Sequence, residues 1–149
     1  RRTYTWLENL MHIVNQALNF QIGAGVPQDW STHLIGHELT AYYNLDHARS
    51  LAVVQPYLLE VMNEDKKEKI AQLGKNVFGI QNDNKAVIKA IEAVYNKVGV
   101  PTKLSDYEID DKVISNVSAA LTKNGYTAMG ENENITLDKV ATILTMSMK

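Results

Sequence analysis

The chain has 149 residues, 45% of them hydrophobic and 21% charged, and a formal net charge of −2 at pH 7. This length suffices for one domain with a core, and Lys+Arg 15 against Asp+Glu 17 leaves no basic field to attract nucleic acid or an anionic membrane. With no cysteine and no apolar run of roughly 18–20 residues, we expect a cytoplasmic protein without disulfides or a membrane span, in which imidazole and carboxylate groups would hold any metal.

Apolar residues recur every three or four positions along most of the chain, which is the spacing of amphipathic helices. This spacing predicts a first helix over 6–22, stopped by Gly23-Ala24-Gly25, and a second helix over 31–41. The apolar stretch 51–62 contains Pro56, which is expected to kink or restart a helix because proline lacks a backbone N–H and clashes with the preceding turn.

The same pattern continues in the second half of the chain and predicts a final helix after Thr136, preceded by helices over 66–78, 86–98 and 114–121. The helix at 114–121 has several candidate caps: a capping box of Ser105 and Glu108, or equally Asp110 or Asp111. No stretch of four to eight residues alternates apolar and polar, so we predict an all-α domain of six to eight helices without a sheet.

Two polar or glycine-rich stretches are predicted to be structural. The mixed-sign run from Glu64 to Lys69 has helical spacing and is expected to form a solvent-exposed helix face. Gly23-Ala24-Gly25 is too short for a dinucleotide fingerprint and follows a predicted helix, so it is expected to end that helix rather than bind phosphate.

The histidines are the most informative feature, because three of the four lie between Thr32 and His47. His33 and His37 are four residues apart, so on a helix they share a face and lie about 6 Å apart along the axis. His47 follows His33 by fourteen residues, which on an unbroken helix would separate them by about 21 Å. A shared site therefore requires the chain to turn back, and Tyr43-Asn44-Leu45-Asp46 supplies residues that tolerate turns.

Spacing alone leaves several interpretations of these histidines open. They form a metal or acid–base site, or they serve as caps and hydrogen-bonding groups in the core. A zinc-protease motif is absent, because Glu38 lies outside the pair His33 and His37 rather than between them. Two further alternatives are a self-contained metal site using all three histidines and a helical module that docks onto other chains with inert histidines.

The sequence around the histidines closely resembles the iron-containing (group III) alcohol dehydrogenases, and most of all their butanol dehydrogenase and broad-specificity aldehyde reductase branch. The resemblance covers nearly the whole chain. It is carried by Ala17-Leu18-Asn19, the run from Gly23 to His33, Gly36 to Ala41, Leu45 to Pro56, Gly99 to Tyr107, Gly130-Glu131-Asn132 and Ile135 to Asp138.

Members of that family have an N-terminal dinucleotide-binding domain and a C-terminal all-helical domain related to the dehydroquinate synthase-like fold, with the active site between them. The resemblance implies that residues 1–149 are part of the helical, metal-binding domain. The chain begins with Arg1-Arg2 instead of methionine, and we expect it to be a piece of a longer polypeptide whose cofactor domain lies upstream.

The resemblance also implies roles for the histidines. In the family an aspartate and three histidines hold one divalent metal, iron or often zinc, and the last two of those histidines match His33 and His47. His37 matches a histidine near the substrate and nicotinamide, and is a candidate proton relay. The remaining aspartate and histidine would lie upstream of Arg1. Tyr43 stands where some relatives have a further histidine, and Asp29 is expected to cap a helix or support the site rather than bind the metal.

The function implied is the NADH- or NADPH-linked interconversion of primary alcohols and aldehydes, with the metal as Lewis acid on the substrate oxygen. A homodimer is the family expectation for the full-length enzyme. The 149 residues alone are expected to be inactive, because half of the metal ligands and the cofactor site would be elsewhere.

Overall fold

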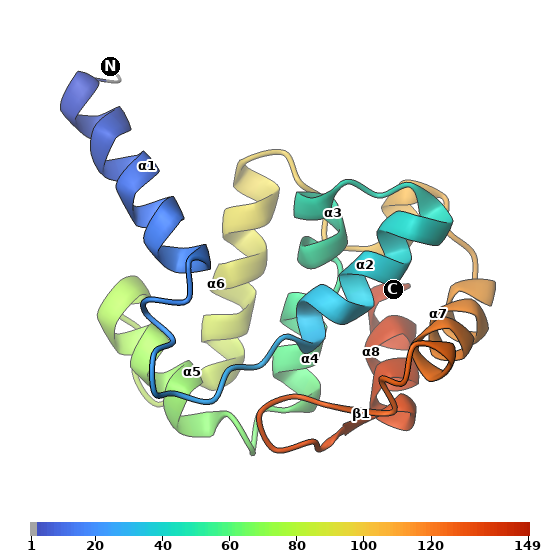
Figure 1. The fold of residues 1–149 in the computed structure, drawn as a ribbon. Helices are drawn as coiled ribbons and strands as arrows, with labels where there is room; N and C mark the ends of the chain where they lie inside the picture. The colour runs from blue at the N-terminus through green and yellow to red at the C-terminus, as the bar shows by residue number, and fades with distance from the viewer. Residues whose placement is uncertain (1–2) are drawn as a thin grey trace.

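The computed structural model describes residues 3–149, which form eight α-helices with two short irregular helices and one small hairpin (Figure 1). The elements in chain order are α1 (Tyr4–Leu18), α2 (Ser31–Tyr43), α3 (His47–Ala52), α4 (Gln55–Val61), α5 (Lys67–Leu73), the π-helix η1 (Gly74–Phe78), α6 (Asn84–Lys97), the 3-10 helix η2 (Leu104–Tyr107), α7 (Lys112–Lys123), β1 (Ala128–Met129), β2 (Ile135–Thr136) and α8 (Leu137–Ser147). The prediction of an all-α domain is confirmed. Among these residues, no helix combines the length and apolar character needed to span a membrane.

The core lies where α2, α4, α7 and α8 meet. Each of these helices turns its apolar stripe inward, so that side chains three or four positions apart in sequence become fully buried together. The buried cluster includes Ile35 and Leu39 of α2, Leu58 of α4, Val117 and Leu121 of α7, and Val140, Ile143 and Leu144 of α8. This core fixes the position of α2, which carries His33 and His37.

The first helix differs from all the others. α1 has an amphipathic sequence, yet it has no buried residue, and Figure 1 shows it projecting from the rest of the molecule. It ends at Leu18, four residues before the predicted end at Ile22, and Phe20 then adopts a left-handed conformation with φ 64°. Gly23-Ala24-Gly25 therefore lies in the turns beyond the helix instead of stopping it.

Pro56 restarts the chain as the sequence predicts. α3 ends at Ala52, the fully buried Val53 and Val54 make the link, and Pro56 lies in the first turn of α4. Proline is tolerated there because the first helical N–H groups have no partner within the helix.

The predicted helix 66–78 is regular only as far as Leu73 and continues as the π-helix η1. Gly74 is buried at this transition, where an added Cβ would lie 2.4 Å from Val87 Cγ2 and 2.9 Å from the Ile80 carbonyl oxygen. Glycine is therefore required for α6 and the segment after η1 to approach this closely.

Two local predictions are wrong. A small antiparallel hairpin exists, with Ala128 opposite Thr136 and Met129 opposite Ile135, and its two-residue strands are too short to produce an alternating pattern. The proposed capping box of Ser105 and Glu108 does not form, because Ser105 lies inside η2 and α7 begins only at Lys112. Asp111 occupies the N-cap position without a side-chain bond, whereas Asp110 Oδ1 accepts the Lys112 N–H at 3.2 Å.

Candidate metal centre

α2 presents His33 and His37 on one face. Gly36, the residue before His37, allows α3 to come close. Gly36 is buried, and a Cβ there would lie 3.1 Å from Ser50 Oγ and 3.2 Å from Leu51 Cδ2. A larger side chain at Gly36 would push against α3, which carries the third histidine. The glycine therefore helps to bring the two helices that hold the histidines together.

The chain turns back between α2 and α3, as a shared site requires. Asn44 ends α2 in the left-handed conformation, φ 54°, with its N–H donated to the Thr40 carbonyl oxygen. Asn tolerates this conformation better than most residues do. Asp46 then starts α3 by accepting the Arg49 N–H at 3.1 Å, which places His47 at the first position of the helix.

All three histidine rings come together at this corner. The ring centres of His33 and His47 are 5.3 Å apart, and the ring centre of His37 lies 6.2 Å from each of the other two. Two imidazoles bound to one tetrahedral ion, at metal–nitrogen distances of about 2.0–2.1 Å, have ring centres roughly 5 Å apart. The spacing of His33 and His47 thus fits a shared divalent ion, and His37 lies at a longer distance.

Three histidines alone do not complete a site in this chain. Among residues 3–149, no group of three or more His, Asp or Glu side chains is arranged to hold a metal ion. Neutral imidazoles suit iron and zinc alike. The three histidines therefore do not form a complete ligand set among the described residues, which counts against the self-contained three-histidine alternative.

The electrostatics at this corner favour the neutral imidazole of His33. Burial lowers the pKa of His33 below its usual 6.5, and positive charge on His47 and on His37 lowers it further. His33 is half-buried, whereas His37 and His47 are exposed. The neutral form is the one that binds a metal.

Two aromatic side chains that the sequence analysis did not single out support His33. The indole of Trp30 packs edge-on against the His33 ring with centres 5.1 Å apart, and Phe20 packs on Trp30 at 5.8 Å. The contact of Trp30 with His33 could have been predicted from the sequence. The two residues are three positions apart at the start of a predicted helix, and such pairs share a helix face.

A partly buried ion cluster holds the segment that enters α2. Lys66 Nζ lies 2.9 Å from Asp29 Oδ2 and 2.7 Å from Glu131 Oε1, with the three side chains only 12%, 16% and 28% exposed, respectively. Asp29 also accepts the Ser31 N–H at 2.8 Å. Asp29 thus fixes the start of α2 without occupying its N-cap position, which is Trp30.

The prediction that the run from Glu64 to Lys69 is a solvent-exposed face is therefore wrong for Lys66. Its neighbours in the run are exposed, but Lys66 is drawn inward by two carboxylates that are distant in sequence. Burial alone would lower the pKa of Lys66, and hydrogen bonds and charge from Glu131 and Asp29 outweigh burial and raise it.

Two other polar contacts tie α2 to α7. The Tyr43 hydroxyl accepts a hydrogen bond from Asn116 Nδ2 at 2.9 Å, so this position serves packing between helices. Glu38 is buried and accepts from Asn124 Nδ2 at 2.8 Å. Neither contact involves a histidine.

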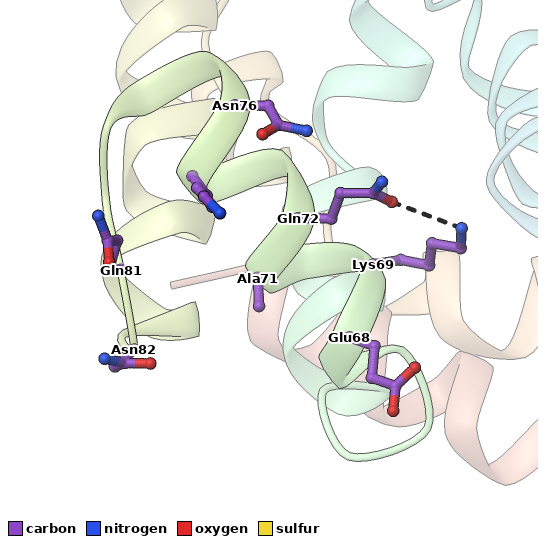
Figure 2. A pocket seen from close by; sticks show the side chains of 8 residues that line it. Glu68, Lys69, Ala71, Gln72, Asn76, Gln81 and Asn82 are labelled. Carbon is purple, nitrogen blue, oxygen red and sulfur yellow. Dashed lines mark hydrogen bonds between the residues drawn. The ribbon is translucent and has the colours of Figure 1, made fainter.

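A polar cleft lies on a different part of the molecule. Figure 2 shows this hollow of about 560 Å³, where Lys69 Nζ donates to Gln72 Oε1 at 3.5 Å. α5, η1 and the loop before α6 form it, lined mainly by Glu68, Lys69, Gln72, Asn76, Gln81 and Asn82. None of the elements that carry His33, His37 or His47 contributes to it.

The helical fold agrees with what sequence comparison finds. The chain belongs to the Fe-containing alcohol dehydrogenase family and matches the C-terminal part of the family over residues 8–148. The family prediction made from the motifs is confirmed.

Particular relatives share this part of the family. The NADPH-dependent aldehyde reductase YqhD of Escherichia coli (strain K12) is 46% identical over 135 residues, which are 87% of this chain and 35% of that protein. The NADH-dependent butanol dehydrogenase A of Clostridium acetobutylicum is 30% identical, over 93% of this chain and 38% of its own length. The chain thus spans little more than a third of these relatives.

Solved structures agree with the sequence comparison. A crystal structure of E. coli K-12 YqhD matches with a TM-score of 0.93 and 41% identity over 97% of this chain and 38% of its own. The NADH-dependent butanol dehydrogenase A from Thermotoga maritima matches with a TM-score of 0.80 and 25% identity over 90% of this chain and 37% of its own.

Proposed function

We propose that residues 1–149 are part of the C-terminal helical domain of a metal-dependent, NAD(P)H-linked enzyme that interconverts aldehydes and primary alcohols. The observation that carries this proposal is the 5.3 Å separation of the His33 and His47 rings in a member of the Fe-containing alcohol dehydrogenase family. The relatives named above include an NADPH-dependent aldehyde reductase and an NADH-dependent butanol dehydrogenase, so we extend to this chain the substrate class but no coenzyme preference.

In this proposal His33 and His47 supply two ligands to a divalent metal, and the remaining ligands come from the part of the enzyme outside the chain. A bound iron or zinc ion supplies Lewis acidity toward the substrate oxygen. Because neutral imidazole carries no charge, His33 and His47 leave more positive charge on the ion than thiolates would. Burial of His33 lowers its pKa and so favours that neutral form.

His37 has a different role in the proposal. It lies beside both ligands and its side chain is exposed, so an imidazole nitrogen can exchange a proton between the substrate oxygen and solvent. Imidazole suits this task because its usual pKa of about 6.5 lies near neutral pH. We also propose that the complete enzyme works as a cytoplasmic homodimer, as the family resemblance implies.

The test uses a hybrid enzyme, in which this chain replaces the matching C-terminal part of E. coli YqhD. We expect the hybrid to oxidise NADPH with butyraldehyde and to retain about one divalent metal per chain by elemental analysis. His33→Ala and His47→Ala should lose both the metal and the activity. His37→Ala should retain the metal and lose turnover, because the ligands remain while the proton path is cut.

The free chain provides the contrasting measurement. We expect it to show no NADPH oxidation with butyraldehyde and only weak Zn²⁺ binding by calorimetry, unaffected by His37→Ala. Tight one-to-one binding that disappears in His37→Ala would instead mean that all three histidines surround one ion. The role of His37 as a proton relay would then be abandoned.

A further inference from the structure

α1 carries a continuous apolar face, and none of its side chains is buried by the described part of the chain. At 100° per residue, its apolar side chains fall on one side of the helix and its polar side chains on the other. The apolar side chains are 42% to 74% exposed at Leu7, Leu10, Met11, Ile13, Val14 and Leu18. Such a wide apolar surface on a helix normally marks an interface.

The face is also shaped to receive another element. Leu10, Met11, Val14 and Leu18 line a shallow groove of about 550 Å³ along the helix, with Asn15 and Asn19 at its edge. Because α1 has no buried residue, packing within residues 3–149 does not explain its position. Its exit from the rest of the fold is visible in Figure 1.

The structural match with a longer relative nevertheless extends into α1. The E. coli YqhD structure matches 97% of this chain, and the unmatched 3% of 149 residues is four or five residues, fewer than the fifteen of α1. Most of α1 is therefore included in a match with a TM-score of 0.93. The same match covers 38% of the YqhD chain, so 62% of that chain lies outside it.

We propose that the apolar face of α1 is a docking surface for the part of the same polypeptide that precedes this chain in its longer relatives. The inference rests on the proposed function in assuming that such a part exists. The inference adds that α1 is the element of this chain that binds the preceding part of the polypeptide. The surface is suited to protein: its polar side carries Glu8 and His12 but no lysine or arginine, whereas helices that lie on membranes are rich in basic residues.

The experiment compares hydrogen exchange of the α1 amides in the free chain and in the hybrid enzyme. We expect exchange in α1 to slow by about tenfold or more in the hybrid, because docking protects the helix from local unfolding. Exchange in α7, which is part of the core in both proteins, should change little. Equal exchange of α1 in the two proteins would overturn the inference.

Matched variants test whether the apolar side chains of α1, and not the helix in general, are responsible for the protection. The double variant Leu10→Gln/Val14→Gln should abolish the protection of α1 in the hybrid while leaving thermal unfolding of the free chain unchanged. The control Glu8→Gln/His12→Gln alters the polar face of the same helix and should retain the protection. Loss of protection in both variants would contradict a docking face made of the apolar side chains.

The readouts also separate this inference from the proposed function. An inactive hybrid with protected α1 amides would support the docking surface and count against the proposed activity. An active hybrid with unprotected α1 amides would support the proposed activity and overturn the docking surface. Protection that appears in the free chain only as its concentration rises, together with dimers in sedimentation, would assign the face to a second copy and overturn the inference.

Discussion

His33 is distinguished from an ordinary imidazole by its surroundings. Its pKa is lowered by burial first, then by charge on His47 and His37. Because the folded-state pKa lies below the unfolded value of 6.5, its contribution to stability is fully present above pH 6.5 and is lost as the pH falls through the folded-state pKa. The ligand-competent form therefore persists to lower pH than for a free histidine.

We predict that His33 titrates below 6.5 in an NMR titration of the metal-free chain. His47→Gln should move the pKa of His33 upward, because it removes the nearest positive charge while leaving the burial intact. His12→Gln, on the exposed helix α1, is the control and should leave the pKa of His33 unchanged. A pKa at or above 6.5 in the unmodified chain would contradict this account.

The loss of Lys66 should cost the fold more stability than the loss of an exposed charged side chain. Lys66→Met leaves Asp29 and Glu131 without their shared cation, and breaking a largely buried ion pair costs about 3 kcal/mol. The matched variant Lys112→Met removes a pair whose side chains are 78% and 59% exposed, and should change the free energy of unfolding by less than about 1 kcal/mol. Urea denaturation at pH 7 compares the two. Equal costs would show that the cluster around Lys66 is not special.

The helices were largely predictable from sequence, because their apolar periodicity is the same pattern that builds the core. The second helix was predicted over 31–41 and is observed over Ser31–Tyr43, and the restart at Pro56 is confirmed. The end of α1 was not predictable, because the apolar spacing continues up to Ile22 and does not reveal the contact of Phe20 with Trp30 beyond the helix. The π-helix at Gly74 lies close to Val87 of α6. The apolar spacing within one segment does not reveal such a contact with another segment.

The candidate site was predictable in part. Spacing showed that His33 and His37 share a helix face and that a turn at Asn44 was needed for His47 to join them, and both features are observed. The roles of the three histidines stay predictions. Lys66 was missed because its two carboxylate partners are 37 and 65 residues away, and sequence spacing carries no signal at that range.

At the scale of one element, Gly74 offers a sharp test of the join between α5 and η1. Gly74→Ala places a methyl group 2.4 Å from Val87 Cγ2 and close to a backbone oxygen, which has no flexible end that can move aside. We expect a loss of about 2–3 kcal/mol in the free energy of unfolding, typical of overpacking. The double variant Gly74→Ala/Val87→Ala should recover part of that loss. No destabilisation in the single variant would mean that η1 relaxes into a regular helix.

At the scale of the whole molecule, the described residues form one core and one helix that contributes no side chain to it. The helices α2, α4, α7 and α8 enclose the fully buried side chains, and α1 contributes none. Stability should therefore be unevenly distributed along the chain, because burial of apolar surface provides the main favourable term in folding.

We predict that deleting residues 3–19 changes the free energy of unfolding by less than about 0.5 kcal/mol, since surface changes away from the core cost little. Deleting residues 137–149 should prevent folding, because α8 supplies Val140, Ile143 and Leu144 to the core. Circular dichroism during urea denaturation checks both variants. A large loss of stability in the first would mean that α1 packs on the core in solution.

The short connection between α2 and α3 bears on how quickly the two proposed ligands can assemble. His47 follows His33 by only fourteen positions, so closing this corner costs little loop entropy, and local contacts of this kind form early. Helix formation and short-loop closure take about a microsecond or less. A newly made chain can therefore bring this pair of imidazoles together before the long-range packing of α2 against α7 is complete.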